Sequence, residues 1–120
     1  MSNDAEKKAN DLADAIRALG VIFIGRLPSA LTSMDDELYS IEKDPHNQSA
    51  WKTLHRHLHS MAGSAGTFGH NELGDRAREL ENRINDMLKS GDVSSDPVRL
   101  AFILDQRNFM AWISEQYVNK

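Results

Sequence analysis

The residues best suited to chemistry lie between positions 54 and 69, where the chain reads Leu-His-Arg-His-Leu-His-Ser-Met-Ala-Gly-Ser-Ala-Gly-Thr-Phe-Gly. An unperturbed imidazole titrates near neutral pH, so a neutral histidine ring is available there as a nucleophile or a metal ligand. Gly63 and Gly66 fall inside the same helical pattern, although a glycine costs a helix about 1 kcal/mol relative to alanine. This composition indicates a requirement beyond ordinary packing.

The directions of these residues around the predicted helix separate the histidine from the core. With Leu58 placed at zero, His59 lies at roughly 100°, and Gly63 and Gly66 lie at roughly 140° and 80°. The apolar stripe from Trp51 to Phe68 centres near about -25° on the same scale. The two glycines therefore flank His59 rather than the core. We predict that the missing side chain at Gly63 leaves the ring open to another protein.

The helix that carries His59 and the helix that follows it are expected to form an antiparallel hairpin, and the second helix supplies a possible partner for this histidine. If its turn centres near residue 70, antiparallel positions at equal distance from the turn lie level, which pairs His59 with Glu81. A carboxylate that accepts a hydrogen bond from Nδ1–H would fix the tautomer and leave Nε2 free as the nucleophile. The predicted chemistry is attack of a neutral imidazole on phosphorus.

The segment from His59 to Gly69, followed by a helix with Leu73, Ala77, Leu80 and Glu81, resembles the histidine-containing phosphotransfer (Hpt) domain, and most of all that of the chemotaxis histidine kinase. The resemblance covers residues 21–90 as a pattern and 58–81 as a motif. It implies that His59 is the phosphoacceptor, that Gly63 is the small residue beside it, and that Glu81 orients the imidazole. It also implies a four-helix bundle.

The same resemblance implies a phosphoryl carrier that is not itself an enzyme. Its expected partners are a histidine kinase or hybrid kinase and the receiver domain of a response regulator. The carrier is expected to need no cofactor of its own, because the receiver contributes Mg²⁺ and most of the electrostatic stabilisation.

One position departs from the family pattern. The family usually has lysine three residues after the histidine, where this chain has Ala62. We hypothesise that Arg56 or Arg78 supplies the missing cation. The predicted partner surface comprises His59 with its flanking residues His55, Arg56, Ala62, Gly63, Gly66 and Arg78.

Two other interpretations remain open. The bundle could be a helical interaction module that docks and inhibits a receiver or kinase domain without carrying phosphate. Alternatively, His55 and His59 have the i, i+4 spacing of zinc ligands, with Glu81 or the distant His70 as a third ligand.

The elements that must position these residues are helical throughout. Apolar residues recur at helical spacing along almost the whole chain, which predicts an all-α antiparallel four-helix bundle over residues 21–118 with an additional short N-terminal helix over residues 1–20. Asn3 and Glu6 have capping-box spacing, Gly20 is expected to close the first helix, and Pro28 either begins or kinks the second. Asp96 is expected to cap the last helix, and Leu88 to end the buried stripe before it. Together these elements predict a single domain over residues 1–120.

Composition limits the kinds of partner, of chemistry and of cellular location that remain for this chain. The 120 residues carry a net charge of -4, which disfavours nucleic acid and anionic lipid as partners. The chain has no cysteine, and therefore no disulfide or thiol chemistry. We see no apolar run close to the roughly 20 residues that cross a bilayer and no signal peptide. The sequence thus predicts a cytoplasmic monomer that does not enter a membrane.

Overall fold

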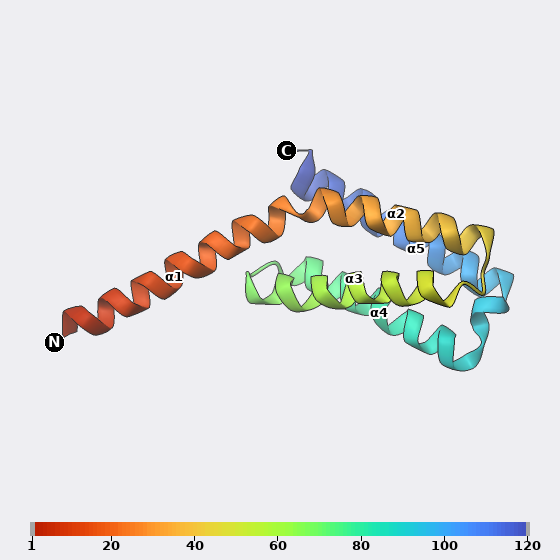
Figure 1. The fold of residues 1–120 in the computed structure, drawn as a ribbon, viewed down its shortest axis with the longest axis horizontal. Helices are drawn as coiled ribbons and strands as arrows, with labels where there is room; N and C mark the ends of the chain where they lie inside the picture. The colour runs from red at the N-terminus through yellow and green to blue at the C-terminus, as the bar shows by residue number, and fades with distance from the viewer. Residues whose placement is uncertain (1, 120) are drawn as a thin grey trace.

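The computed structural model describes residues 2–119 as a series of helices (Figure 1). The five long helices are α1 (Ser2–Gly25), α2 (Leu27–Lys43), α3 (Gln48–Thr67), α4 (Asn71–Ser90) and α5 (Asp96–Ile113). A short 3₁₀ helix (Asp92–Ser94) precedes α5, and a π-helical turn (Ser114–Val118) follows it. Within the described residues there is no strand, which confirms the all-α prediction.

Helices α2 to α5 pack as an antiparallel bundle, as predicted, with α2 and α5 above α3 and α4 in the view of Figure 1. The core consists of apolar side chains that all four helices contribute at helical spacing. Its largest fully buried members include Trp51, Phe102, Leu27, Leu38, Leu58 and Ile84. Burial of such stripes is what stabilises helices of this length, because backbone hydrogen bonding alone leaves them marginal in water.

The hairpin of α3 and α4 begins and ends at residues suited to helix termini. The Asn47 side chain accepts a hydrogen bond from the Ala50 amide at 3.1 Å and so caps α3. Gly69, just after α3, and Gly91, just after α4, have φ of 83° and 80°, the left-handed conformation that favours glycine. The turn between the two helices therefore lies at residues 68–70, where the sequence predicted it.

The first helix is longer than predicted. It continues through Gly20 to Gly25, so the prediction that Gly20 ends it is wrong. A Cβ atom built at Gly20 would lie 3.5 Å from the Phe68 ring, an ordinary contact, so Gly20 works as a packing residue within the helix. Asn3 already lies inside α1 and is not its cap. Pro28 lies in the first turn of α2, which settles the choice left open in favour of a helix start.

Two smaller predictions are also corrected near the other helix ends. Met87 is buried at the end of the α4 stripe, whereas Leu88 is 37% exposed. Asp96 lies inside α5, and the residue in the cap position is Ser95. The carboxylate of Asp96 pairs with Arg99 one turn later, so it contributes a side-chain contact in place of a cap.

The expectation that no apolar run comes close to the length of a membrane span is corrected by one stretch near the N-terminus. Within Asn3–Lys43 one 18-residue window has a mean hydropathy of 1.4, which meets the length and composition of a membrane span. The structure divides this region at Arg26, where α1 ends and α2 begins. Only 6% of that window is buried, so most of the stretch lies on the exposed part of α1, while Leu27, in the first turn of α2, belongs to the core.

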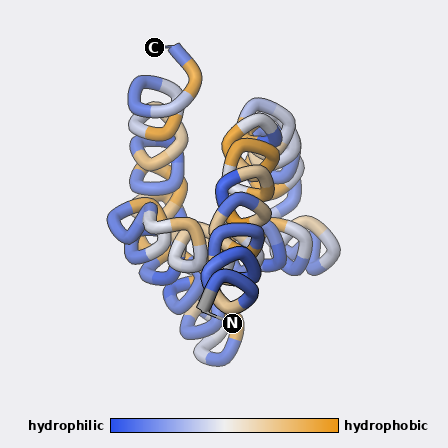
Figure 2. The backbone as a smooth tube through the Cα atoms, turned by 90° about the vertical axis from the view of Figure 1, so that its left-hand side faces the viewer, coloured by the Kyte–Doolittle hydropathy of each residue, from blue (hydrophilic) through white to orange (hydrophobic). Residues whose placement is uncertain are grey.

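Helix α1 projects from the bundle and gives the molecule its extent of 63 × 31 × 21 Å (Figure 1). In Figure 2 its first turns are hydrophilic, and the turns nearer the bundle are hydrophobic. Only the end of α1 contacts the bundle closely: Phe23 packs against Phe68 and His70 with ring centroids 5.7 and 6.3 Å apart.

Candidate functional site

His59 and Glu81 form the central contact of the candidate site. The Nδ1 atom of His59, on α3, lies 2.8 Å from Oε1 of Glu81, on α4. An ionised carboxylate can only accept a hydrogen bond, so in the neutral ring Nδ1 carries the proton and Nε2 keeps its lone pair. The His59 side chain is 71% exposed, whereas that of Glu81 is 13% exposed. The contact expected from the hairpin register is therefore present, with the carboxylate behind an accessible ring.

A second histidine adjoins the same carboxylate. Nε2 of His55, one turn before His59, lies 3.8 Å from Oε1 of Glu81, which is too long for a hydrogen bond. This nitrogen is buried and has no hydrogen-bond partner among the described residues. The two imidazole rings are nearly parallel, with centroids 6.3 Å apart. His55 thus lies beneath the site as a half-buried neighbour of the pair rather than on its exposed rim.

The glycines beside His59 are not required by packing. A Cβ atom built at Gly63 or Gly66 would meet no atom within 4 Å. Gly63 instead borders a shallow hollow of about 420 Å³, together with His59, Ser60, Ser64, Thr67 and Phe68. A methyl group at Gly63 would not touch the imidazole, so the role of Gly63 in clearing the ring stays a prediction.

The glycine that packing does require was missed by the sequence analysis. Gly74, on α4, lies against α3 so closely that a Cβ atom would stand 3.2 Å from the backbone oxygen of Ala62. This approach brings the two helices together on the side where His59 and Glu81 meet. Its sequence signal was a glycine at a core position of α4, three residues before Ala77.

The cation question is partly decided by position. A hollow of about 160 Å³ is bordered by His59 and Glu81 together with Ala62, Gly63, Arg78 and Asn82. Arg78, on the facing helix, therefore borders the same hollow as the ring, as does Asn82, which the sequence analysis did not single out. Arg56 is exposed but borders neither hollow next to His59.

Ala62 does not lie where the partner surface was expected. It is only 3% exposed and lies between α3 and α4, so its side chain offers no surface to another protein. The error arose because its direction on α3 falls between the core stripe and His59, and Gly74 lets α4 cover it.

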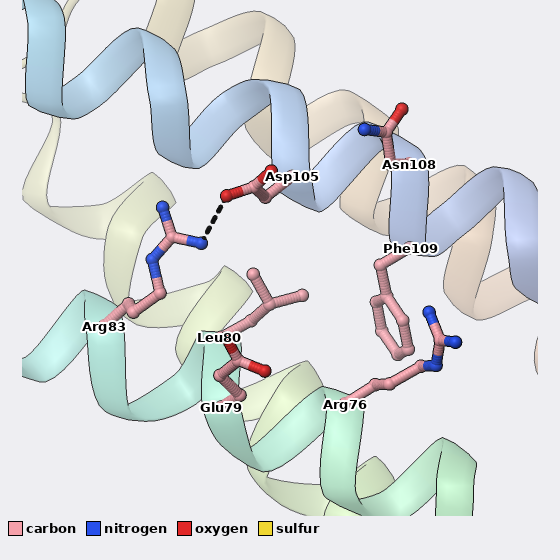
Figure 3. Close-up of a pocket in the computed structure, with 7 residues that line it drawn as sticks. All are labelled: Arg76, Glu79, Leu80, Arg83, Asp105, Asn108 and Phe109. Carbon is pink, nitrogen blue, oxygen red and sulfur yellow. Dashed lines mark hydrogen bonds and ion pairs between the residues drawn. The ribbon is translucent and has the colours of Figure 1, made fainter.

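A separate pocket between α4 and α5, about 290 Å³ in volume, contains none of these residues (Figure 3). Arg83 there pairs with Asp105 at 2.6 Å, as the dashed line in Figure 3 shows. Arg76 pairs with Glu72 at 2.8 Å and lies over the Trp112 ring. Both guanidinium groups already have partners, and the lining includes no nucleophilic side chain, so this pocket is not the reactive site.

Of the two third ligands considered for zinc, Glu81 lies beside both histidines, whereas His70 does not. His70 lies at the hairpin turn, where its ring packs against Phe23 and, edge on, against Tyr117. Across residues 2–119 no group of three His, Cys, Asp or Glu side chains is placed to hold a metal ion. His59 forms a hydrogen bond with Glu81, and His55 lies 3.8 Å from the same carboxylate without forming one.

Comparison with known proteins decides the family. The profile of the Hpt domain matches residues 18–112. The chain belongs to the Hpt domain family. Chemotaxis protein CheA of Halobacterium salinarum is 30% identical to the Hpt domain described here over 67 residues, which is 55% of this chain and 10% of that protein. No solved structure matches the chain significantly.

Membership defines the kind of signalling module that this chain contains. Hpt domains are soluble phosphocarrier modules of two-component signalling, in which kinases and receiver domains are their partners. This Hpt domain spans about one tenth of the length of its CheA relative. The family match begins at residue 18, so the larger part of α1 lies outside it.

Proposed function

We propose that His59 is the phosphoacceptor of this Hpt domain and that the domain relays phosphoryl groups to or from the aspartate of a receiver domain. The observation that carries the proposal is the bond between Nδ1 of His59 and Glu81 at 2.8 Å, on a ring that is otherwise accessible. This bond fixes the tautomer in which Nε2 is the nucleophile.

The transfer step follows from this geometry. The Nε2 lone pair attacks the phosphorus of an aspartyl phosphate on the receiver, the bond from phosphorus to the aspartate oxygen breaks, and the aspartate leaves as a carboxylate. The product carries phosphorus on Nε2 and positive charge on the ring, which Glu81 stabilises through Nδ1–H. The reverse step returns the phosphoryl group. With a histidine kinase as donor, the bond that breaks is the one to the β-phosphate oxygen of ATP.

The domain contributes position and charge, while its partner contributes the remaining stabilisation. Arg78 borders the hollow beside His59 and is the cation best placed to meet phosphoryl oxygens where the family usually has lysine. We place the Mg²⁺ required for transfer in the receiver. A cytoplasmic location is part of the same proposal, because a receiver partner would be found there.

The test is phosphorylation of the purified domain by a phosphorylated receiver with Mg²⁺. We expect acid-labile, base-stable phosphate on the wild-type domain and none on His59→Gln, with helical circular dichroism unchanged. His57→Gln is the matched control and should be labelled normally. Label that persists on folded His59→Gln would overturn the assignment. Unlabelled wild-type domain that still slows receiver dephosphorylation would indicate the alternative, a non-phosphorylated interaction module.

The proposed role of Arg78 has its own test. Arg78→Glu should slow transfer from a phosphorylated receiver by about tenfold or more, whereas Arg56→Glu, outside the two hollows, should have a smaller effect. Equal rates for wild type and Arg78→Glu would remove Arg78 from the mechanism without affecting the assignment of His59.

A further inference from the structure

Helix α1 carries an apolar stripe that the bundle leaves uncovered. Leu12, Ile16 and Leu19 are 63%, 40% and 54% exposed. The full stripe alternates spacings of four and three residues, which is the heptad spacing of helices that pair in coiled coils. Its members are Ala5, Ala9, Leu12, Ile16, Leu19 and Phe23. Only Phe23, at its end, packs against the bundle.

A projecting helix of this kind is incomplete by itself. Residues 3–19 of α1 are almost entirely exposed, and isolated helices of that length are marginal in water. Contiguous exposed apolar residues of this type mark an interaction surface. We therefore expect a second helix to cover the stripe.

We propose that the second helix is α1 of another copy of this chain, aligned antiparallel and centred at the level of Asp14. In that register Leu12 of each copy faces Ile16 of the other, Ala9 faces Leu19, and Ala5 faces Phe23. Each contact joins an a position to a d position, as antiparallel pairing requires, and every member of the stripe finds a partner.

Side-chain volume favours this register over a parallel one. The small residues Ala5 and Ala9 meet the large residues Phe23 and Leu19, so all layers have similar total volume. A parallel pair would place alanine on alanine at one end and phenylalanine on phenylalanine at the other. The small end also enters the space beside the bundle, where an apolar groove of about 630 Å³ is lined by Ile16, Gly20, Val21, Ile24, Phe68 and neighbouring residues.

Charge is complementary in the same arrangement. Residues 4–14 carry four carboxylates against two lysines, which leaves two net negative charges. Residues 15–26 carry Arg17 and Arg26 and no acid. Antiparallel pairing places the acidic half of each helix beside the basic half of the other. An anionic lipid surface fits less well, because the projecting end is net negative.

Light scattering with size-exclusion chromatography tests the association over a concentration series up to about 100 µM. We expect wild type to approach twice the monomer mass and the double variant Leu12→Gln, Ile16→Gln to remain at the monomer mass. Ala18→Gln is the control, since Ala18 is exposed on α1 and belongs neither to the apolar stripe nor to the groove, and it should behave as wild type. A monomeric wild type, or a dimeric double variant, overturns the proposal.

The register is tested by single cysteines, which are unambiguous because the chain has none. Mild oxidation of an equal mixture of Ala9→Cys and Leu19→Cys should give mainly the mixed disulfide. Disulfides of each variant with itself would overturn the antiparallel register. This test does not depend on whether the polar variants keep α1 folded.

Other occupants give distinct results. If wild type is monomeric but sediments with phosphatidylcholine and phosphatidylglycerol vesicles, a membrane covers the stripe. If it is monomeric and the double variant slows transfer from a receiver, the receiver covers it. Either result overturns the proposal. The proposal itself departs from the sequence analysis, which predicted a monomer. Loss of dimerisation should leave labelling of His59 intact, so this proposal and the proposed function fail separately.

Discussion

Gly74 lies directly against the backbone oxygen of Ala62, and a methyl group at position 74 would stand 3.2 Å from that oxygen. At Gly63, one turn from His59, the same methyl group would meet nothing within 4 Å. Gly74 and Gly63 thus play different parts in the hairpin. Gly74 lets the two helices approach each other, whereas Gly63 leaves the surface near the imidazole open.

This contrast predicts opposite effects on stability. Gly63→Ala should raise the free energy of unfolding by up to about 1 kcal/mol, because alanine favours the helix and fits without a clash. Gly74→Ala gains the same propensity but must displace a backbone carbonyl, and we expect it to be less stable than Gly63→Ala by about 1–3 kcal/mol. Denaturant unfolding of both variants measures the difference. Equal stabilities would show that the α3–α4 spacing does not depend on Gly74.

Removal of the Glu81 carboxylate should release the His59 tautomer. In wild type the ring should appear in ¹⁵N NMR as the Nδ1–H form at a pH where it is neutral. Glu81→Ala should populate the Nε2–H form and slow phosphoryl transfer, since the nucleophilic nitrogen then carries the proton. Glu81→Gln keeps an oxygen that can accept from Nδ1–H, and it should retain more activity than Glu81→Ala. An unchanged tautomer in Glu81→Ala would contradict the orienting role.

Gln106 should be replaceable with a gain in stability. It is fully buried among apolar residues, its Nε2 reaches only the sulfur of Met34 at 3.4 Å, and its Oε1 has no partner in the described structure. Gln106→Leu should raise the free energy of unfolding by about 1–2 kcal/mol, because it removes an unsatisfied buried group at similar volume. Gln106→Ala should lower it by about 2 kcal/mol or more, because it leaves a cavity. Calorimetric unfolding distinguishes the two, and a destabilised leucine variant would argue that Oε1 is satisfied in solution.

Tyr117 should make stability depend on alkaline pH. Burial, and secondarily the negative charge of Glu72, raise the pKa of Tyr117 above its ordinary value of 10.0. The pKa of Tyr117 is higher in the folded protein than in the unfolded one, so the neutral phenol favours the folded state. This contribution to the free energy of unfolding is fully present below about pH 10 and is lost as pH rises through the pKa of the folded protein. Tyr117→Phe should lack this loss.

The two tyrosines of the chain allow a direct measurement. In Tyr39→Phe the remaining tyrosine is Tyr117, so an absorbance titration of that variant reports this phenol alone. Its midpoint should lie above 10.0. A midpoint at or below that value would remove the expected pH dependence.

The sequence predicted the parts of the site that depend on helical periodicity. The spacing of apolar residues fixed the faces of α3 and α4, and the position of the turn fixed their register, so the contact of His59 with Glu81 could be anticipated. Ala62 and Gly74 could not, because the depth of a residue on the flank of a helix depends on how closely the neighbouring helix approaches.

The helix boundaries show the same limit. Gly20 is compatible with a helix end and also with a helix interior, and its contact with Phe68 decided for the interior. Leu88 and Met87 are adjacent candidates for one stripe, and the packing of α4 in the bundle buries Met87 and leaves Leu88 37% exposed. Tertiary contacts chose between local alternatives that the sequence left nearly equal.

The imidazole and its carboxylate come from the two arms of one hairpin, joined through residues 68–70. Their alignment therefore depends directly on the packing of α3 against α4, where Gly74 lies against Ala62. One continuous segment, residues 59–81, therefore carries both members of the pair.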